Sequence, residues 1–141
     1  MGKKVALEPR ELAVLAAEAA AEKKAEDLMV IDVAETLVIT AYFVLATGRT
    51  DRQVRTIADE VEKVLREQAG VKPLGREGER EGKWVLLDFG DVVVHVFQPD
   101  EREFYRLEKL WSDAPRVELP ESVTGPRALE ASGQTDMVVG S

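Results

Sequence analysis

Several residue types that carry chemistry are rare or missing in this chain, which has no cysteine and a single histidine, His95. Without cysteine the protein can form no disulfide and offers no thiolate for catalysis or for zinc, and this composition suits a reducing cytosol. One histidine cannot build the two-histidine motif of zinc proteases, and neither common glycine-rich phosphate motif occurs. We therefore expect no metal and no cofactor.

Long apolar runs and an excess of positive charge are also missing. No segment approaches the roughly 20 apolar residues needed to span a bilayer, and residues 1–7 lead into charged sequence instead of a secretory signal. The 19 Lys and Arg against 27 Asp and Glu give a net charge of −8, which opposes binding to a phosphate backbone and favours a basic partner. We expect a soluble, cytoplasmic protein without membrane contact and with little direct nucleic-acid binding.

The length and the composition of the C-terminal part predict the domain organisation. A chain of 141 residues fits one domain with a substantial core. From Pro120 onward the sequence is rich in Gly, Ser, Thr and Pro and has no sustained periodicity. We predict one domain over residues 1–119, followed by a flexible C-terminal tail over residues 120–141.

Hydrophobic spacing predicts several helices and strands along the chain. Thr50 to Gln53 has the form of a capping box, so a helix should begin there and end at Gly70. The charged stretch over residues 76–83 should be a solvated loop. The other predicted elements are a helix from Pro9 to about Lys24, strands over Leu28–Val33 and Tyr42–Thr47, and a helix from Pro99 to near Ser112 with the apolar stripe Phe104, Leu107, Leu110 and Trp111.

Two strand-like runs, 84–89 and 92–97, are separated only by Gly90-Asp91. A two-residue Gly-Asp connection between such runs predicts a tight β-hairpin, because glycine supplies the positive φ that these turns need. The turn also fixes the register, and with it the residues that share a face. One face should carry the pairs Phe89 with Val92, Leu87 with Val94 and Val85 with Val96, and the other Trp84 with Phe97, Leu86 with His95 and Asp88 with Val93.

The two faces of this hairpin differ in character. The first is wholly apolar and should pack on the core. The second places a carboxylate and the imidazole of His95 among large apolar groups, a mixture that is typical of a binding surface. A structural alternative remains open, in which a helix covers this face as well and Asp88 and His95 are satisfied inside the protein.

Three weaker patterns could indicate catalysis or ligand binding. Backbone amides of residues 47–50 could hold an anion, although a turn with a helix cap explains the same residues. His95 could act as a general base, but the register places Leu86 opposite it. Asp32, Asp88 and Asp91 could converge on magnesium, so a magnesium-dependent nucleotidyltransferase is an alternative function.

Longer stretches of the chain carry a resemblance to a known family. The relevant runs are Ala25-Glu26-Asp27 through Asp32-Val33, Tyr42-Phe43-Val44-Leu45-Ala46-Thr47-Gly48, Asp51-Arg52-Gln53-Val54, the whole hairpin over residues 84–97, Glu101-Arg102-Glu103-Phe104-Tyr105 and Leu107-Glu108-Lys109-Leu110-Trp111. Together they resemble the Iojap-like ribosomal silencing factor family. The resemblance implies a nucleotidyltransferase-like α/β fold without catalysis, and a homodimer when free. It also implies a translational repressor that binds the large ribosomal subunit through ribosomal protein fourteen and blocks association with the small subunit.

The resemblance also implies which residues contact the partner. Trp84 and Phe89 match hydrophobic contact positions of the family, and Asp88, Gly90 and Asp91 match its acidic hairpin tip. With Leu86 and His95 from the mixed face, these residues form the predicted partner-binding set. The sequence departs from the family at Ala41, where aspartate is common, and at Gln98, where histidine is frequent. A large-subunit assembly adaptor remains a further alternative function.

Overall fold

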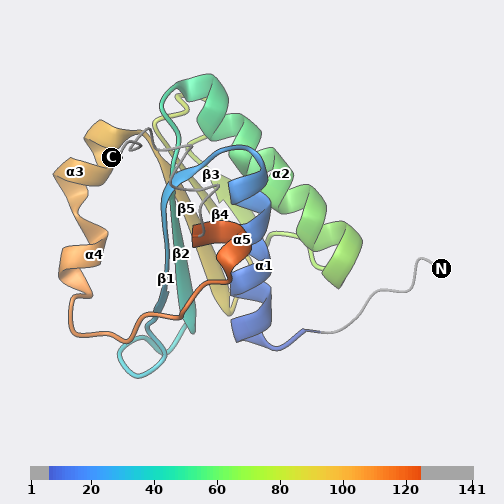
Figure 1. The fold of residues 1–141 in the computed structure, drawn as a ribbon, viewed down its shortest axis with the longest axis vertical. Coiled ribbons are helices and arrows are strands. Elements are labelled where there is room, and N and C mark those ends of the chain that lie inside the picture. The colour runs from blue at the N-terminus through green and yellow to red at the C-terminus, as the bar shows by residue number, and fades with distance from the viewer. Residues whose placement is uncertain (1–6, 125–141) are drawn as a thin grey trace, which may run out of the picture.

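A computed structural model describes residues 7–124 and has the predicted α/β fold (Figure 1). Most of the predicted helices and strands are confirmed, within a few residues at their ends. In chain order the elements are α1 (Pro9–Glu22), β1 (Glu26–Asp32), β2 (Tyr42–Thr47), α2 (Asp51–Ala69), β3 (Gly75–Glu77), β4 (Trp84–Asp88), β5 (Val92–Phe97), α3 (Pro99–Tyr105), α4 (Leu107–Leu110) and α5 (Glu121–Thr124).

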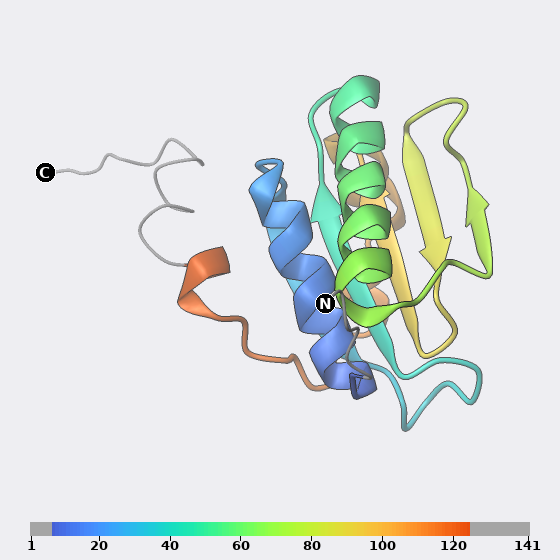
Figure 2. The ribbon, with the colours of Figure 1, turned by 90° about the vertical axis from the view of Figure 1, so that its right-hand side faces the viewer.

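The strands form one mixed five-stranded sheet in the order β1-β2-β5-β4-β3. Strands β2 and β5 are parallel, and the other neighbouring strands are antiparallel. Helices α1 and α2 cover one face of the sheet, and α3 and α4 lie over the other (Figures 1 and 2). Within residues 7–124, no helix is long and apolar enough to cross a membrane.

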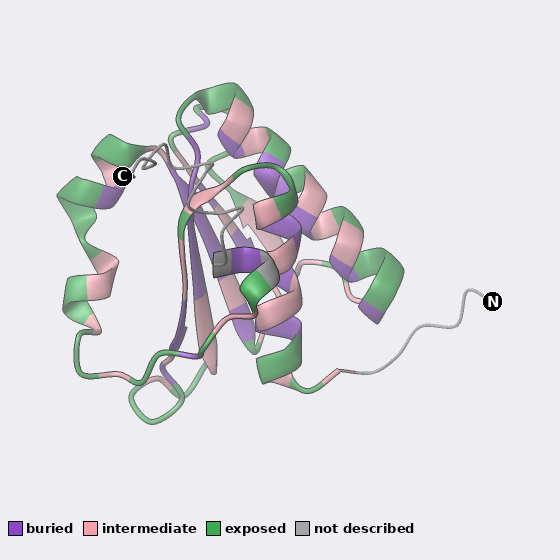
Figure 3. Cartoon of the chain, in the orientation of Figure 1, coloured by how far each residue is buried: buried purple, intermediate pink, exposed green. Residues whose placement is uncertain are grey.

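The main core lies between the sheet and the pair α1 and α2, where the buried parts of both helices face the strands (Figure 3). Alanines of α1 allow close packing against the sheet, and Ala13, Ala16 and Ala20 are fully buried. Helix α2 begins as predicted at Thr50, whose Oγ1 accepts a hydrogen bond of 3.0 Å from the Gln53 N–H. Gln53 Oε1 accepts from the N–H of Arg49 at 2.7 Å, one residue before the position that the capping-box pattern predicts.

The predicted hairpin register is confirmed throughout. Strand β4 pairs with β5 through Trp84 with Phe97, Leu86 with His95 and Asp88 with Val93, and the Phe89 N–H donates to the Val92 carbonyl at 2.8 Å. Gly90 has a φ of 90°, as a tight two-residue turn requires. The predicted core side is also confirmed, since Val85, Leu87, Val94 and Val96 are fully buried.

The predicted loop over residues 76–83 is wrong at its start, because Arg76 and Glu77 belong to the short edge strand β3. Arg76 makes ion pairs with Asp59 at 2.7 Å and Glu62 at 2.6 Å, both on α2, and with Glu79 at 2.8 Å. The two ion pairs to α2 tie β3 to that helix, while antiparallel pairing places β3 beside β4. The charged residues of this stretch show no apolar alternation, so the sequence pattern predicts a loop.

The single predicted helix from Pro99 to Ser112 is also wrong, because the chain breaks into α3 and α4 at Arg106. Arg106 has a φ of 50° and a ψ of 53°, a left-handed conformation that ends α3. The predicted apolar stripe is consequently split. Leu107 and Trp111 pack against a second apolar cluster built on Ile31, Val33, Leu45 and Phe97, whereas Phe104 and Leu110 are 78% and 72% exposed.

The chain after α4 returns along the outer edge of β1. Asp32 N–H donates to the Pro115 carbonyl at 2.8 Å, and Val117 N–H donates to the Val30 carbonyl at 2.9 Å. Within the predicted tail, α5 contacts α1, and Val123 is buried. Residues 125–141 lie outside the described residues, so the predicted domain boundary and the flexibility of the tail stay predictions.

Candidate partner-binding surface

The side chains of Trp84, Leu86 and Asp88 lie on the sheet face away from α1 and α2, at alternate positions of β4, and all three are partly exposed. We call these three residues the β4 strip. Alternate residues of a strand point to the same side, so the strip runs along the outer part of the sheet towards the hairpin turn. Neighbouring Val93 on β5 is also partly exposed.

Trp84 is held in place by contacts on several sides. Its indole centroid lies 5.1 Å from the Phe97 ring and 4.7 Å from the Tyr105 ring, and its Nε1–H donates to His95 Nδ1 at 3.2 Å. Tyr105 is 48% exposed and extends the apolar surface of the strip from β4 onto the end of α3. Sequence reasoning missed Tyr105, because it placed Phe104 on the inner stripe of a continuous helix.

His95 lies beside the strip on β5, paired with Leu86, and only 5% of its surface is exposed. Burial lowers the pKa of its imidazole from 6.5 to about 4, because the charged form is poorly solvated there. The ring is therefore neutral near pH 7, and the Trp84 donor places the remaining proton on Nε2. The Phe43 ring stands nearly perpendicular to it at 4.8 Å. In this position His95 orients Trp84 and offers almost no surface of its own to a partner.

The hairpin tip presents mainly backbone and carboxylates. Asp88 Oδ1 accepts a hydrogen bond of 2.8 Å from the Gly90 N–H, and Asp91 is exposed. Phe89 packs partly against the main core, on the side that the register predicts. The partner contact that the resemblance implies for Phe89 stays a prediction.

The edge strand β3 supplies a further acid and an open approach to the strip. Glu77 pairs with Leu86, and Gly75 pairs with Asp88, so their outward sides share the face of the strip. Glu77 is exposed. A side-chain carbon added at Gly75 would meet no atom within 4 Å. The strip thus combines the apolar side chains of Trp84 and Leu86 with the carboxylate of Asp88, has Glu77 beside it, and is accessible from the β3 side.

The geometry of the residues concerned does not support the magnesium site or the anion site. Among residues 7–124, no group of three or more His, Asp or Glu is placed to hold a metal ion, so Asp32, Asp88 and Asp91 are not brought together. Residues 47–50 form the turn with a helix cap, the alternative to an anion site. The N–H of Gly48 donates to the Phe97 carbonyl, and the N–H of Arg49 donates to Gln53, so these two amides are occupied.

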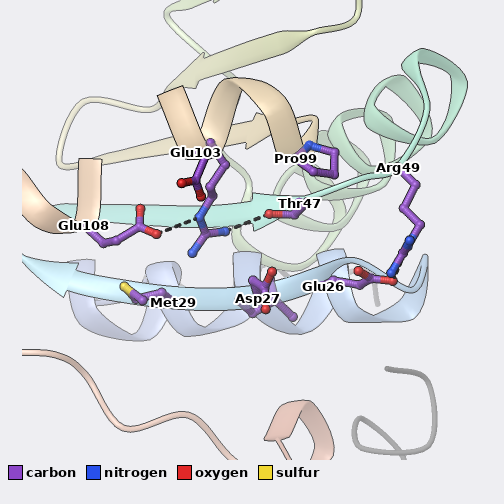
Figure 4. Close-up of a pocket in the computed structure, with 10 residues that line it drawn as sticks. Glu26, Asp27, Met29, Thr47, Arg49, Pro99, Glu103 and Glu108 are labelled. Atoms are coloured by element: carbon purple, nitrogen blue, oxygen red, sulfur yellow. Dashed lines mark hydrogen bonds and ion pairs between the residues drawn. The ribbon is translucent and has the colours of Figure 1, made fainter. Parts of the chain in front are cut away.

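A hollow of about 600 Å³ lies where the parallel strands β2 and β5 end, between β1 and the start of α3 (Figure 4). Arg102, only 8% exposed, donates from Nη1 to Thr47 Oγ1 at 2.9 Å and from Nε to Glu108 Oε2 at 3.3 Å. These bonds tie α3 and α4 to β2. They hold in place the segment that carries Tyr105, an arrangement that no local sequence pattern indicates.

The fold and the strip together define a small α/β protein whose distinctive exposed feature is an apolar row beside acids. Within this class the chain belongs to the family described as "Ribosomal silencing factor during starvation", whose sequence model matches residues 6–138. This result confirms the family that the sequence resembles.

Individual relatives agree with the family assignment. The chain is 46% identical over 110 residues to the ribosomal silencing factor RsfS of Halalkalibacterium halodurans, covering 78% of this chain and 93% of that protein. It is 32% identical over 96 residues to the mouse protein named mitochondrial assembly of ribosomal large subunit protein 1, covering 64% of this chain and 41% of that protein. A crystal structure of a Chromobacterium violaceum protein is similar with a TM-score of 0.73 and 40% identity, covering 75% of this chain and 88% of that one.

Proposed function

We propose that this protein represses translation by binding the large ribosomal subunit through ribosomal protein fourteen and preventing association with the small subunit. The observation that carries the proposal is the partly exposed β4 strip with Tyr105 beside it, where apolar side chains lie near the carboxylates of Asp88, Glu77 and Asp91. An apolar row with aromatic anchors inside a polar rim is the usual composition of a protein-binding surface. The cytoplasmic location expected from the sequence belongs to the same proposal.

The proposed mechanism is steric. Binding free energy holds a folded domain at the subunit interface, and no covalent bond is made or broken, so the protein acts without being an enzyme. Trp84 and Tyr105 supply apolar area in the centre of the contact. The acids steer association with a basic ribosomal protein and make it sensitive to salt. In this arrangement Phe89, Gly90 and Asp91 contact the partner at the hairpin tip, while His95 acts through Trp84.

The free protein is proposed to be a homodimer. Besides the strip, α3 and α4 expose Phe104 and Leu110, and apolar groups gathered on one surface favour association. Analytical ultracentrifugation across a range of protein concentrations measures the oligomeric state. A monomer at all concentrations would contradict the homodimer and leave the ribosome-binding proposal standing.

A subunit-joining assay tests the proposed function directly. Purified large subunits are incubated with the protein, small subunits are then added, and joined ribosomes are separated from free subunits by sedimentation. We expect the protein to migrate with the large subunit and to reduce joining. Binding without any effect on joining would contradict the repressor function.

A large-subunit assembly adaptor is a second candidate, favoured by the name of the mouse relative. The same joining assay with mature subunits separates the two functions, because an adaptor that acts only during maturation leaves mature subunits free to join. Incubation with labelled nucleotides and candidate acceptors tests the nucleotidyltransferase alternative, for which the proposed function expects no transfer.

A side chain at Gly75 is expected to block the partner without disturbing the fold. The position is open and lies on the face of the strip. A lysine there adds both bulk and repulsion towards a basic partner. We expect Gly75→Lys to weaken large-subunit binding by about tenfold or more, at an unchanged melting temperature. Thr56→Lys, an exposed position on α2, adds the same charge on the opposite side. Equal binding by both variants would place the partner elsewhere.

A further inference from the structure

A second group of exposed apolar side chains lies at the hairpin end of the sheet. Val38 is 99% exposed, Ile39 is 83% exposed and Leu74 is 77% exposed. Val38 and Ile39 belong to the loop between β1 and β2, which extends past the end of the sheet (Figures 1 and 2). Leu74 directly precedes β3. We call these three residues, together with Asp91, the tip rim.

The loop that carries Val38 and Ile39 is fixed on both sides. On one side, Leu37 packs against the second apolar cluster, and its N–H donates to the Val33 carbonyl at 2.8 Å. On the other side, Thr40 is 5% exposed, and the Ala41 N–H donates to the Asp91 carbonyl at 2.9 Å. The two apolar side chains are therefore held outward by an anchored loop. Neither is placed where it could stabilise the main core.

Short contacts join the members of the tip rim through the hairpin turn. The Tyr42 N–H also donates to the Asp91 carbonyl, at 3.0 Å, and the Leu74 N–H donates to the Asp88 carbonyl at 2.6 Å. A side-chain carbon added at Gly90 would lie 3.7 Å from Leu74 Cδ1. The rim thus continues from the β1–β2 loop, across the exposed carboxylate of Asp91, to the start of β3. There it meets Asp88, the last residue of the β4 strip.

We propose that the tip rim is a second contact for the same basic protein surface of the large subunit that the β4 strip engages, an inference that rests on the proposed function. Two properties favour this occupant. Exposed apolar groups around a carboxylate complement a basic surface that carries apolar side chains. Continuity with Asp88 lets one rigid partner touch the strip and the rim together. The rim fixes the orientation of the protein on the subunit, while the strip supplies the central anchor.

The test measures binding of purified large subunits to the full chain by sedimentation or by surface immobilisation. We expect the double substitution Val38→Ser and Ile39→Ser to weaken binding by about tenfold. Its melting temperature should equal that of the parent, because both side chains are exposed. The double substitution Val38→Ile and Ile39→Val keeps the apolar surface and should retain parental binding. Thr36→Ser, an exposed position in the same loop, controls for disturbance of the loop.

The outcomes separate this inference from the proposed function. If Trp84→Ala weakens binding and the serine double variant binds like the parent, the rim is not a contact and the proposed function stands. If the parent does not bind large subunits, both proposals fail. If the serine variant changes only self-association in ultracentrifugation, the rim contacts a second copy of the chain and the inference is wrong.

Discussion

Replacing Trp84 with alanine is expected to weaken large-subunit binding by about 2 kcal/mol or more, which is roughly a thirtyfold loss of affinity. The indole is the largest side chain of the β4 strip and lies beside Tyr105 at a centroid distance of 4.7 Å. Truncation removes the central apolar contact and also frees Tyr105 to move away. Cosedimentation with separated large subunits over a range of protein concentrations measures the loss.

The same substitution is expected to lower the free energy of unfolding, since Trp84 is partly buried. Its removal opens space beside Phe97 and takes away the hydrogen bond to His95 Nδ1. Losses on the order of 2 kcal/mol are usual for truncation of a large, partly buried aromatic side chain. Binding must therefore be measured at a temperature where circular dichroism shows the variant to be folded.

A matched control separates lost contact from lost stability. Val61 is fully buried on α2, on the other side of the sheet, and Val61→Ala should destabilise the fold by about 1 to 3 kcal/mol without touching the strip. We expect the Val61 variant to bind large subunits like the parent. Equal binding by a folded Trp84→Ala variant would show that the strip is not the contact surface.

The hairpin could be predicted in detail because its information is local. A two-residue connection leaves one reasonable register, and the register then decides which side chains share a face. The sequence alone therefore places Trp84, Leu86 and Asp88 on one surface. Whether a helix covers that surface depends on contacts between distant segments. In the structure the surface is covered only in part. Trp84 stays partly exposed, while His95 is buried.

The α3–α4 region could not be predicted for the opposite reason. Arg106 adopts a left-handed conformation that arginine rarely visits, so no residue type marks the break. Arg102 reaches Thr47, 55 positions away in the chain, and such pairing has no periodic signature. Tyr105 contacts Trp84 from the end of α3, just before that break, so its place beside the strip could not be predicted either.

The titration of His95 is expected to have a large effect on stability. Its folded-state pKa of about 4 lies below the ordinary value of 6.5. As the pH falls from 6.5 towards 4, the imidazole therefore takes up a proton in the unfolded chain but stays neutral in the folded chain. The free energy of unfolding contributed by this group is complete above pH 6.5 and is lost as the pH falls towards 4. A shift of this size corresponds to about 3 kcal/mol.

The contribution of His95 can be isolated by subtraction. The comparison is with a His95→Gln variant, whose amide oxygen can still accept the Trp84 N–H, so that contributions common to both proteins cancel in the difference. We expect the difference in free energy of unfolding between parent and variant to fall by about 3 kcal/mol between pH 7 and pH 4. Urea titrations at a series of pH values provide these free energies.

Proton NMR gives an independent measurement, because His95 is the only histidine in the chain and its ring signal needs no assignment by mutation. The signal should stay in its neutral position through pH 6 and begin to move only as the pH approaches 4. A midpoint near 6.5 in the folded protein would mean that the imidazole is solvated. His95 would then be exposed beside Trp84 instead of covered, and the surface next to the β4 strip would carry a positive charge at mildly acidic pH that a basic partner would oppose.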